Sequence, residues 1–378
     1  MNVRHVVLIV CLNLAQLPVA MRLLLVTLLA ADRTGSFAVA GLAGGTAAVG
    51  TALTAPWWSR LLPRFGDGRV LVASGGLFLC GQLALAVSHG TAPIIGLAAV
   101  SGLCTPPAAG SVRALLPRLV PPADLTRSYA VNSVALEVVY LGGPLWVTGW
   151  VALAGPTAAL VASTVIGVGC LVVGGALAPS GRRRSPSPGP PLLAEPAVHT
   201  LGGAYLVYWV CMGAMWVLLP AFAERAGAAG QAGLLVALWS AGSLVGGLVL
   251  AARPPRGSKR NSYLWLLGTL AATSLLLVPP TTVGGMAVSV SVFGVALAPW
   301  LAVNDQLVAA SAVERTAELY GWLTTAGQLG SAVGSAVAGP LADRYGGGPA
   351  FLLVTAALGT GFAIALRRRR TLPDSAPT

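Results

Sequence analysis

Three features of the sequence predict an all-α integral membrane protein made of two six-helix bundles: an apolar composition, apolar segments of spanning length along the whole chain, and an internal repeat. Of its 378 residues, 56% are hydrophobic and only 9% are charged, and the mean hydropathy is +0.79. Ordinary soluble domains carry about 25% charged residues. The composition therefore excludes a soluble globular fold.

Twelve segments are long and apolar enough to cross a membrane as helices. Crossing about 30 Å of hydrocarbon takes roughly 20 apolar residues in a helix. The first segment runs from Val6 to Ala31, the fourth from Ala92 to Leu115 and the last from Ala350 to Leu366. The ninth, from Tyr263 to Val278, is the shortest. The sequence therefore predicts twelve transmembrane helices.

The distribution of basic residues predicts the orientation of these helices. Cytoplasmic loops of membrane proteins are enriched in Lys and Arg. With the N-terminus inside, nineteen of the 23 basic residues fall in cytoplasmic segments, three outside, and one, Arg22, within a span. The net charge of +12 therefore reflects membrane topology, and no nucleic-acid partner is expected. Both termini are predicted to be cytoplasmic.

The two halves of the chain are related by a parallel repeat. The stretch AADRTGSFAVAGL (30–42) aligns without a gap with FAERAGAAGQAGL (222–234), and the same offset of 192 places Gly102 on Gly294. Because six spans is an even number, both copies keep one orientation, which gives two halves related by an axis along the membrane normal. The predicted organisation is a bundle over 1–180, a cytoplasmic linker over 181–199, a bundle over 200–370 and a disordered cytoplasmic tail over 371–378.

Motifs of catalytic sites are missing from the sequence. There is no phosphate-binding GxxxxGK[ST], no HExxH and no GxSxG, and the five cysteines and three histidines are scattered. We therefore expect no enzyme, no cofactor and no metal site.

With its six-plus-six plan, the chain resembles the major facilitator superfamily over essentially its full length. The loop SRLLPRFGDGRVL (59–71) is similar to the family's loop between spans two and three, and the residues near its pattern are Leu61, Arg64, Gly66 and Arg69. A closer copy, GPLADRYG (339–346), falls between spans eleven and twelve, where the predicted topology places it outside.

Span five resembles the family's antiporter motif in part. Gly143 and Pro144 match, whereas Val147 and Thr148 stand where a glycine pair is expected. The fourth span, around VSGLCTPPAAG (100–110), lacks the arginine that proton-coupled drug exporters of the family usually carry.

The resemblance implies a secondary active transporter, monomeric in the plasma membrane, that moves a small organic solute across the lipid bilayer by alternating access. It favours a proton-coupled exporter of drugs or secondary metabolites. An uptake permease or a uniporter is the alternative within this class. A non-transporting membrane receptor or scaffold is the alternative from another class, although the chain has no sizeable soluble domain with which to signal.

Glu137 lies in an otherwise apolar run, VALEVVYLGGPLWV (134–147). A charge near the bilayer centre costs roughly 2.5–3.5 kcal/mol on insertion scales, so it persists mainly when it faces a cavity or a partner. Glu137 is therefore a candidate proton-coupling group. The alternative is a structural carboxylate that pairs with Arg22 or bonds to neighbouring backbone.

Polar and aromatic residues in spans one and seven are candidates for a substrate cavity. Arg22 would bind an anionic group, or it pairs with Glu137 or snorkels outward. The aromatic residues of span seven would suit an amphipathic ligand, or they serve in packing and interfacial anchoring. The full set of candidates is Arg22, Asn13, Gln16, Tyr205, Tyr208, Trp209 and Trp216.

The repeat also places opposite charges at corresponding positions of the predicted cytoplasmic mouth. Arg113 corresponds to Asp305, and Arg127 to Glu318 after one residue of drift. These two pairs are predicted to latch that mouth shut in an outward-open state. The alternative is a set of solvated loop charges that contribute under about 1 kcal/mol each.

Overall fold

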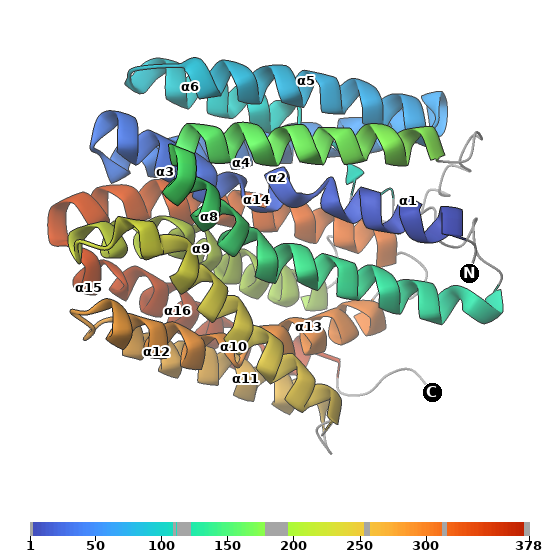
Figure 1. The fold of residues 1–378 in the computed structure, drawn as a ribbon. Helices are drawn as coiled ribbons and strands as arrows, with labels where there is room; N and C mark the ends of the chain where they lie inside the picture. Colours follow the sequence, from blue (N-terminus) through green and yellow to red (C-terminus); the bar gives the residue numbers. More distant parts are fainter. Residues whose placement is uncertain are drawn as a thin grey trace. The chain divides into compact units, whose positions relative to one another are not determined.

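The computed structural model describes residues 3–108, 111, 122–177, 196–252, 258–311 and 316–373. Regular structure within these ranges is entirely helical (Figure 1), which confirms the predicted all-α class. The longer helices are α1 (Val3–Leu14), α3 (Arg22–Thr34), α4 (Phe37–Phe65), α5 (Asp67–Val87), α6 (Thr91–Leu103), α8 (Pro122–Leu177), α9 (Pro196–Arg225), α10 (Ala232–Ala252), α11 (Lys259–Ser274), α12 (Val283–Gly294), α13 (Leu297–Ser311), α14 (Thr316–Tyr345) and α16 (Leu352–Arg367). Short helices are α2 (Leu17–Ala20) and α15 (Gly347–Ala350), with 3₁₀ turns η2 (Ala229–Gln231), η3 (Leu275–Leu277) and η5 (Arg369–Thr371).

Eight helical segments among the described residues are long and apolar enough to cross a membrane. Two predicted spans contain shorter helices: α6 has 13 residues and α11 has 16. Pro106 and Pro107 lie just beyond α6, and proline disfavours helical conformation in the residue before it. The count of twelve spans stays a prediction.

Helix α8 covers the predicted spans five and six. Its backbone is interrupted at Gly155, where φ is 82° and ψ is 174°. Residues with a side chain rarely adopt this conformation, whereas glycine does so at little cost. Pro156 follows, and its fixed φ suits the first turn of a new helix. The chain therefore changes direction at the Gly-Pro pair.

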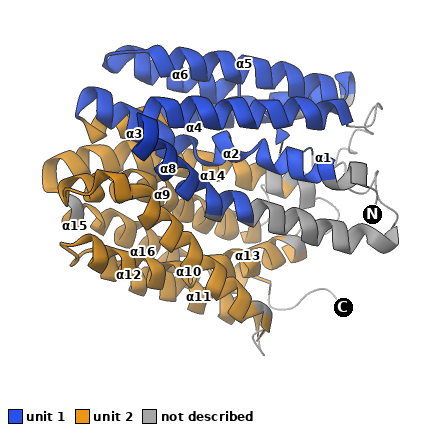
Figure 2. Ribbon diagram, viewed as in Figure 1, with its two compact units in different colours: residues 1–35, 46–187 blue, residues 36–45, 188–378 orange. Residues whose placement is uncertain are grey.

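The chain divides into two compact units (Figure 2). Unit 1 comprises residues 1–35 and 46–187, and unit 2 comprises residues 36–45 and 188–378. Helix α4 therefore contributes its first turns to unit 2 and the remainder to unit 1.

The internal repeat is visible in how helices pack inside each unit. In unit 1, a Cβ atom on Gly50 of α4 would lie 2.6 Å from the carbonyl oxygen of Ala99 on α6. On Gly102, a Cβ would overlap the backbone of Ala47. The same two contacts occur 192 residues later in unit 2. There, a Cβ on Gly242 would overlap the carbonyl oxygen of Ser291, and a Cβ on Gly294 would overlap that of Trp239. Small residues at these four places let the helix backbones touch, which is a main source of helix association in lipid.

Two arginines at equivalent places in the repeat both bind carbonyl oxygens at the ends of helices. Arg33, at the end of α3, donates to the carbonyl oxygens of Ser88 and Ala86 and to the Thr157 hydroxyl. Its counterpart Arg225, at the end of α9, donates to the carbonyl oxygens of Ala342 and Asp343 at 2.6 and 3.0 Å. Cations are favourable near helix C-termini. The repeat has therefore kept the type of interaction while changing the helix that accepts it.

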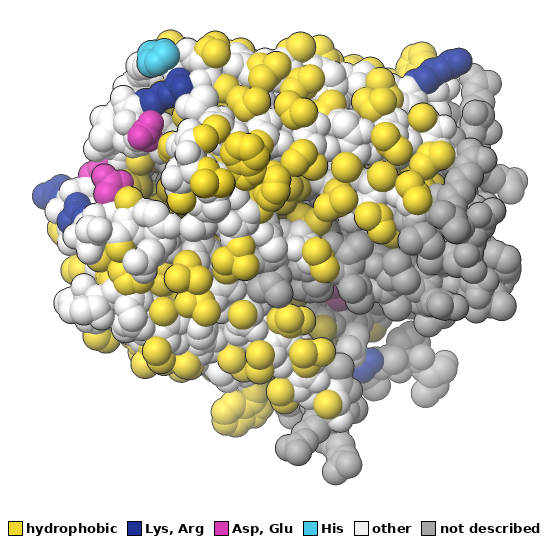
Figure 3. All heavy atoms as spheres, in the orientation of Figure 1, with side chains coloured by type: hydrophobic (Ala, Val, Ile, Leu, Met, Phe, Trp, Pro, Cys, Tyr) yellow, Lys and Arg dark blue, Asp and Glu magenta, His cyan; other side chains and the backbone are white. Residues whose placement is uncertain are grey.

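Apolar side chains cover much of the described surface. On the face shown in Figure 3, hydrophobic side chains are spread over the described surface, and charged side chains are few. Leu153, Trp265 and Val87 are 83%, 78% and 74% exposed. Exposed large apolar side chains in such number are expected to face lipid.

Replacing Gly102 by leucine tests the glycine contacts. The new side chain overlaps the backbone of Ala47, so we expect Gly102→Leu to lower the free energy of unfolding by about 1–3 kcal/mol. Gly96→Leu on the same helix is the control, because no atom lies within 4 Å of a Cβ there. Thermal unfolding of the purified variants in detergent provides the measurement. Equal melting temperatures for both variants would contradict the packing.

Candidate functional site

A buried polar cluster in unit 1 lies where the first predicted span is broken. Met21 separates α2 from α3, and Arg22 is the first residue of α3. Arg22 is only 7% exposed, and its Nη1 donates to the Thr105 hydroxyl at 2.6 Å. The hydroxyl oxygens of Thr105 and Thr51 lie 3.0 Å apart. A guanidinium has five N–H donors, and the hydrogen bond to Thr105 uses one of them.

Asn13 and Gln16, also predicted to line the cavity, interact with one another at the junction of α1 and α2. Asn13 is 1% exposed, and its Nδ2 donates to the carbonyl oxygen of Ile9 at 2.8 Å. Gln16 Nε2 donates to Asn13 Oδ1 at 3.3 Å. These bonds satisfy polar groups at a helix break, and a contact of either residue with substrate stays a prediction.

The span-five motif packs against the same break. A Cβ on Gly143 of α8 would lie 2.8 Å from the Met21 sulfur, so the glycine permits α8 to approach the junction of α2 and α3. Pro144 follows inside α8 and is buried. Glu137 lies in α8 as well, but its side chain is outside the described residues. Its pairing with Arg22 therefore stays a prediction.

An aromatic cluster fills the interior of unit 2. Tyr208 of α9 stacks on Trp300 of α13 with ring centroids 4.6 Å apart, and Trp300 lies 5.5 Å from Tyr263 of α11. Tyr205 and Trp209 extend the cluster along α9, with centroids 6.1 Å apart. Three of the four aromatic residues predicted from span seven are thus brought together.

The fourth, Trp216, belongs to a different aromatic pair. Its ring contacts Trp239 of α10, with centroids 5.9 Å apart. Trp239 is 5% exposed, and its indole nitrogen has no hydrogen-bond partner among the described residues.

Unsatisfied polar atoms concentrate in the aromatic cluster. Asn304 lies one turn after Trp300 on α13 and is fully buried. Neither its amide nitrogen nor its amide oxygen has a hydrogen-bond partner within the described ranges, and the same holds for the Trp300 indole and the Tyr263 hydroxyl. Leaving such a group unpaired costs roughly 1–3 kcal/mol. A ligand or water that pairs with the Asn304 carboxamide would remove that cost. Asn304 and Trp300 were not among the residues predicted from the sequence, although their i, i+4 spacing in APWLAVND places them on one helix face.

The loop between α4 and α5 carries the residues that match the superfamily pattern. Gly66 has φ 86°, a conformation that requires glycine, and it directly precedes α5. Leu61 packs against Trp58, Leu62 and Val70. Arg64 and Arg69 are exposed. These residues shape the corner between the two helices.

The predicted cytoplasmic latch falls largely outside the described residues. Arg113 lies beyond them, and the side chains of Arg127 and Glu318 do as well. Asp305 lies on α13 and is half-buried. Both pairs stay predictions.

Asp343 caps the first turn of α4 within unit 2. Its carboxylate accepts hydrogen bonds from the Ser36 hydroxyl at 2.9 Å, from the Phe37 amide at 3.0 Å and from the Ala38 amide at 2.8 Å. A carboxylate at a helix N-terminus satisfies free N–H groups and interacts favourably with the helix dipole. The GPLADRYG stretch thus holds the start of a helix some 300 residues earlier in the chain.

Close backbone contact supports the cap. A Cβ on Gly41 would overlap the carbonyl oxygen of Ser335, and one on Gly339 would overlap that of Phe37. Residues 36–45 and α14 therefore meet through small residues spaced four apart, the pattern that brings membrane helices together.

Removing the Asp343 carboxylate should loosen this contact. We expect Asp343→Ala to reduce the stability of the contact between residues 36–45 and α14 by about 0.5–2 kcal/mol, the usual range for loss of an N-cap. Hydrogen–deuterium exchange of a peptide covering residues 36–45 would then speed up. Asp32→Ala is the control, because Asp32 is an exposed acid at the end of α3. Unchanged exchange in Asp343→Ala would show that the cap contributes no stability.

The sequence matches the model of the Major Facilitator Superfamily over residues 8–335. The chain belongs to this superfamily. Among solved structures, a bacterial homologue of the human lysosomal transporter Spinster, in an inward-facing and occupied conformation, aligns with a TM-score of 0.73 at 14% identity, covering 97% of this chain and 96% of that one. The nucleoside transporter NupG aligns with a TM-score of 0.74 at 12% identity, covering 98% and 99%.

A human relative has the same fold. The organic anion transporter MFSD10 aligns with a TM-score of 0.64 at 18% identity, covering 97% of this chain and all of that one. No curated protein matches the chain by sequence. At these identities the solved structures show the fold alone, so the chain has the fold of a multi-pass membrane transporter of this superfamily.

Proposed function

We propose that the protein is a proton-coupled secondary transporter that exports a small organic solute across the plasma membrane by alternating access, acting as a monomer. The observation that carries the proposal is the buried carboxamide of Asn304, which has no hydrogen-bond partner among the described residues and lies one turn from Trp300 of the aromatic cluster in unit 2. The superfamily supplies the transport mode, and the resemblance to its exporters supplies the outward direction.

The chemistry of this site selects a class of solute. Stacked rings with centroids 4.5–7 Å apart favour a flat, largely apolar group that can join the stack. The Asn304 carboxamide offers one acceptor and two donors, so it pairs with a group that presents a donor and an acceptor side by side. A planar solute with an amide-like edge satisfies both conditions. NupG, which has this fold, is a transporter of nucleosides.

Arg22 supports a separate candidate site in unit 1. Its buried guanidinium donates to Thr105 through Nη1, and the other N–H groups of a guanidinium suit an acidic group. Solutes that carry a carboxylate or a phosphate would be held there by charge-assisted hydrogen bonds. MFSD10, the organic anion transporter, has the same fold.

Transport into proteoliposomes tests the function. A panel of labelled planar solutes, neutral and acidic, is first screened for those that raise the melting temperature of the purified protein. We expect at least one to accumulate in protein-containing vesicles and not in empty ones. Asn304→Leu should reduce its uptake about tenfold or more, since a polar contact to the solute is lost. Gln231→Leu, at an exposed amide in η2, is the matched control.

Two results would contradict this account in different ways. If no solute accumulates, the chain is a receptor or scaffold and not a transporter. If a solute accumulates equally well in wild type and Asn304→Leu, the protein transports but the site lies elsewhere.

Glu137 is the proposed proton-coupling residue. With the carboxyl group replaced by an amide, Glu137→Gln should lose transport driven by a pH gradient while solute exchange continues at close to the wild-type rate. Glu224→Gln, at an exposed acid near the end of α9, should retain both activities. Undiminished pH-driven uptake in Glu137→Gln would show that this residue does not couple protons. If transport by the wild type does not change with the pH gradient, a uniporter is favoured.

A further inference from the structure

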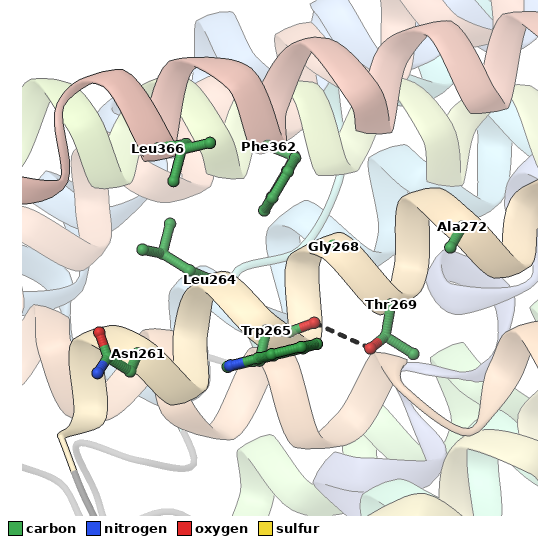
Figure 4. Close-up of a pocket in the computed structure, with 8 residues that line it drawn as sticks. All are labelled: Asn261, Leu264, Trp265, Gly268, Thr269, Ala272, Phe362 and Leu366. Carbon is green, nitrogen blue, oxygen red and sulfur yellow. Dashed lines mark hydrogen bonds between the residues drawn. The ribbon is translucent and has the colours of Figure 1, made fainter.

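An open groove runs between α11 and α16 on the outside of unit 2. It forms a cavity of about 480 Å³, within the range of roughly 300–1,000 Å³ that is usual for small-molecule sites. Leu264 and Gly268 of α11 line it opposite Phe362 and Leu366 of α16 (Figure 4). The Thr269 hydroxyl, also in the lining, donates to the carbonyl oxygen of Trp265 at 2.9 Å. The described lining therefore presents mostly carbon to an occupant.

The matching helix pair of unit 1 packs through glycines at its described positions. There, a Cβ on Gly68 of α5 would overlap the carbonyl oxygen of Gly175 in α8, and one on Gly75 would overlap the Leu171 side chain. The positions 192 residues later are Arg260 and Leu267. Larger side chains have replaced the glycines that allow close approach, and a groove stays open between α11 and α16.

Basic residues gather at one end of the groove. Leu366 lies at that end and is followed directly by Arg367 to Arg370, all exposed. On the facing helix, Lys259 and Arg260 precede Asn261, the lining residue at the same end (Figure 4). Six cationic side chains thus occur within a few residues of the groove's end.

The length of the groove matches one leaflet of a bilayer. Its lining on α11 runs from Asn261 to Ala272, which at 1.5 Å per residue is about 16 Å. Half of the hydrocarbon core is about 15 Å. Trp265, 78% exposed near the basic end, lies where tryptophans typically meet the head-group region. An acyl chain would therefore fill the groove when its head group reaches the arginines.

We propose that this groove binds an anionic phospholipid, with an acyl chain along Leu264, Gly268 and Phe362 and the phosphate group at Arg367–Arg370. The charge of the basic end selects an anionic over a zwitterionic head group, because each basic residue near an anionic lipid surface strengthens binding about fivefold. The apolar lining, in which the Phe362 ring faces Gly268, selects a lipid over a free anion. The proposal is independent of the transported solute, and its test does not require transport.

Lipid-dependent thermal stability tests the site. The purified full-length protein is titrated in detergent with phosphatidylglycerol, with phosphatidylcholine and with inorganic phosphate, and the melting temperature is followed. A ligand that binds only the folded protein raises this temperature with its concentration. We expect phosphatidylglycerol to stabilise the wild type at concentrations at least tenfold lower than phosphatidylcholine, and inorganic phosphate to have no comparable effect.

Two sets of variants separate the contribution of the groove lining to lipid affinity from that of the basic residues. Gly268→Leu fills the groove and should lower the apparent affinity for phosphatidylglycerol at least tenfold, whereas Gly76→Leu, at the equivalent position of α5 with no atom within 4 Å of a Cβ, should leave it unchanged. Replacing Arg369 and Arg370 by glutamine should lower the apparent affinity for phosphatidylglycerol about 25-fold. Replacing the exposed Arg60 and Arg64 by glutamine is the charge control.

Four outcomes would overturn the proposal. Equal stabilisation by the two lipids would remove the head-group selectivity. Stabilisation by inorganic phosphate at the same concentration would indicate a free-anion site. Unchanged affinity in Gly268→Leu would place the lipid elsewhere. A dimer in the wild type that Gly268→Leu converts to a monomer would show that a second copy of the chain covers the groove.

Discussion

Direct contact between glycine Cα atoms and neighbouring helix backbones is the constraint on which this structure depends. Lipid tails are as apolar as the helix surfaces, so burial from water does not drive helix association here, and close packing must do so. Gly50 and Gly102 provide that packing in unit 1, and Gly242 and Gly294 provide it in unit 2. Gly242 and Gly294 lie 192 residues after Gly50 and Gly102, so the duplication has kept the same helix packing in both units. Equivalent backbone contacts hold the helices together in each unit.

The functional groups occur where this regular packing is interrupted. Arg22 follows the break at Met21, and Gly143 lets α8 reach that break. In unit 2, Asn304 and Trp300 lie on α13, the second piece of a span that is divided at Gly294 to Leu297. Broken helices place polar groups at membrane depth without leaving the backbone exposed to lipid, and transporters commonly build binding sites there.

Sequence reasoning recovered the class, the repeat and the aromatic content of span seven, because composition and glycine spacing are local properties. The fourth span was predicted from Ala92 to Leu115, and α6 ends within it at Leu103, just before Pro106 and Pro107. Most of the residues from 109 to 121 lie outside the described ranges, so the end of that span stays a prediction. Asn304 was missed because the burial of its carboxamide depends on tertiary packing in unit 2. The role of Asp343 was missed because its partners lie some 300 residues away, at Ser36, Phe37 and Ala38.

In the proposed transport cycle we predict that residues 36–45 separate from α14, because alternating access requires packed helices to part, so the reactivity of Ser335→Cys tests the cycle most directly. Ser335 is fully buried beneath Gly41. In a background without native cysteines, we predict that this thiol reacts with a water-soluble maleimide, and reacts faster when Asp343 is also replaced by alanine. A thiol at Ser274, equally buried inside unit 2, should stay unreactive. Protection of both thiols alike, with or without the Asp343 carboxylate, would contradict the account.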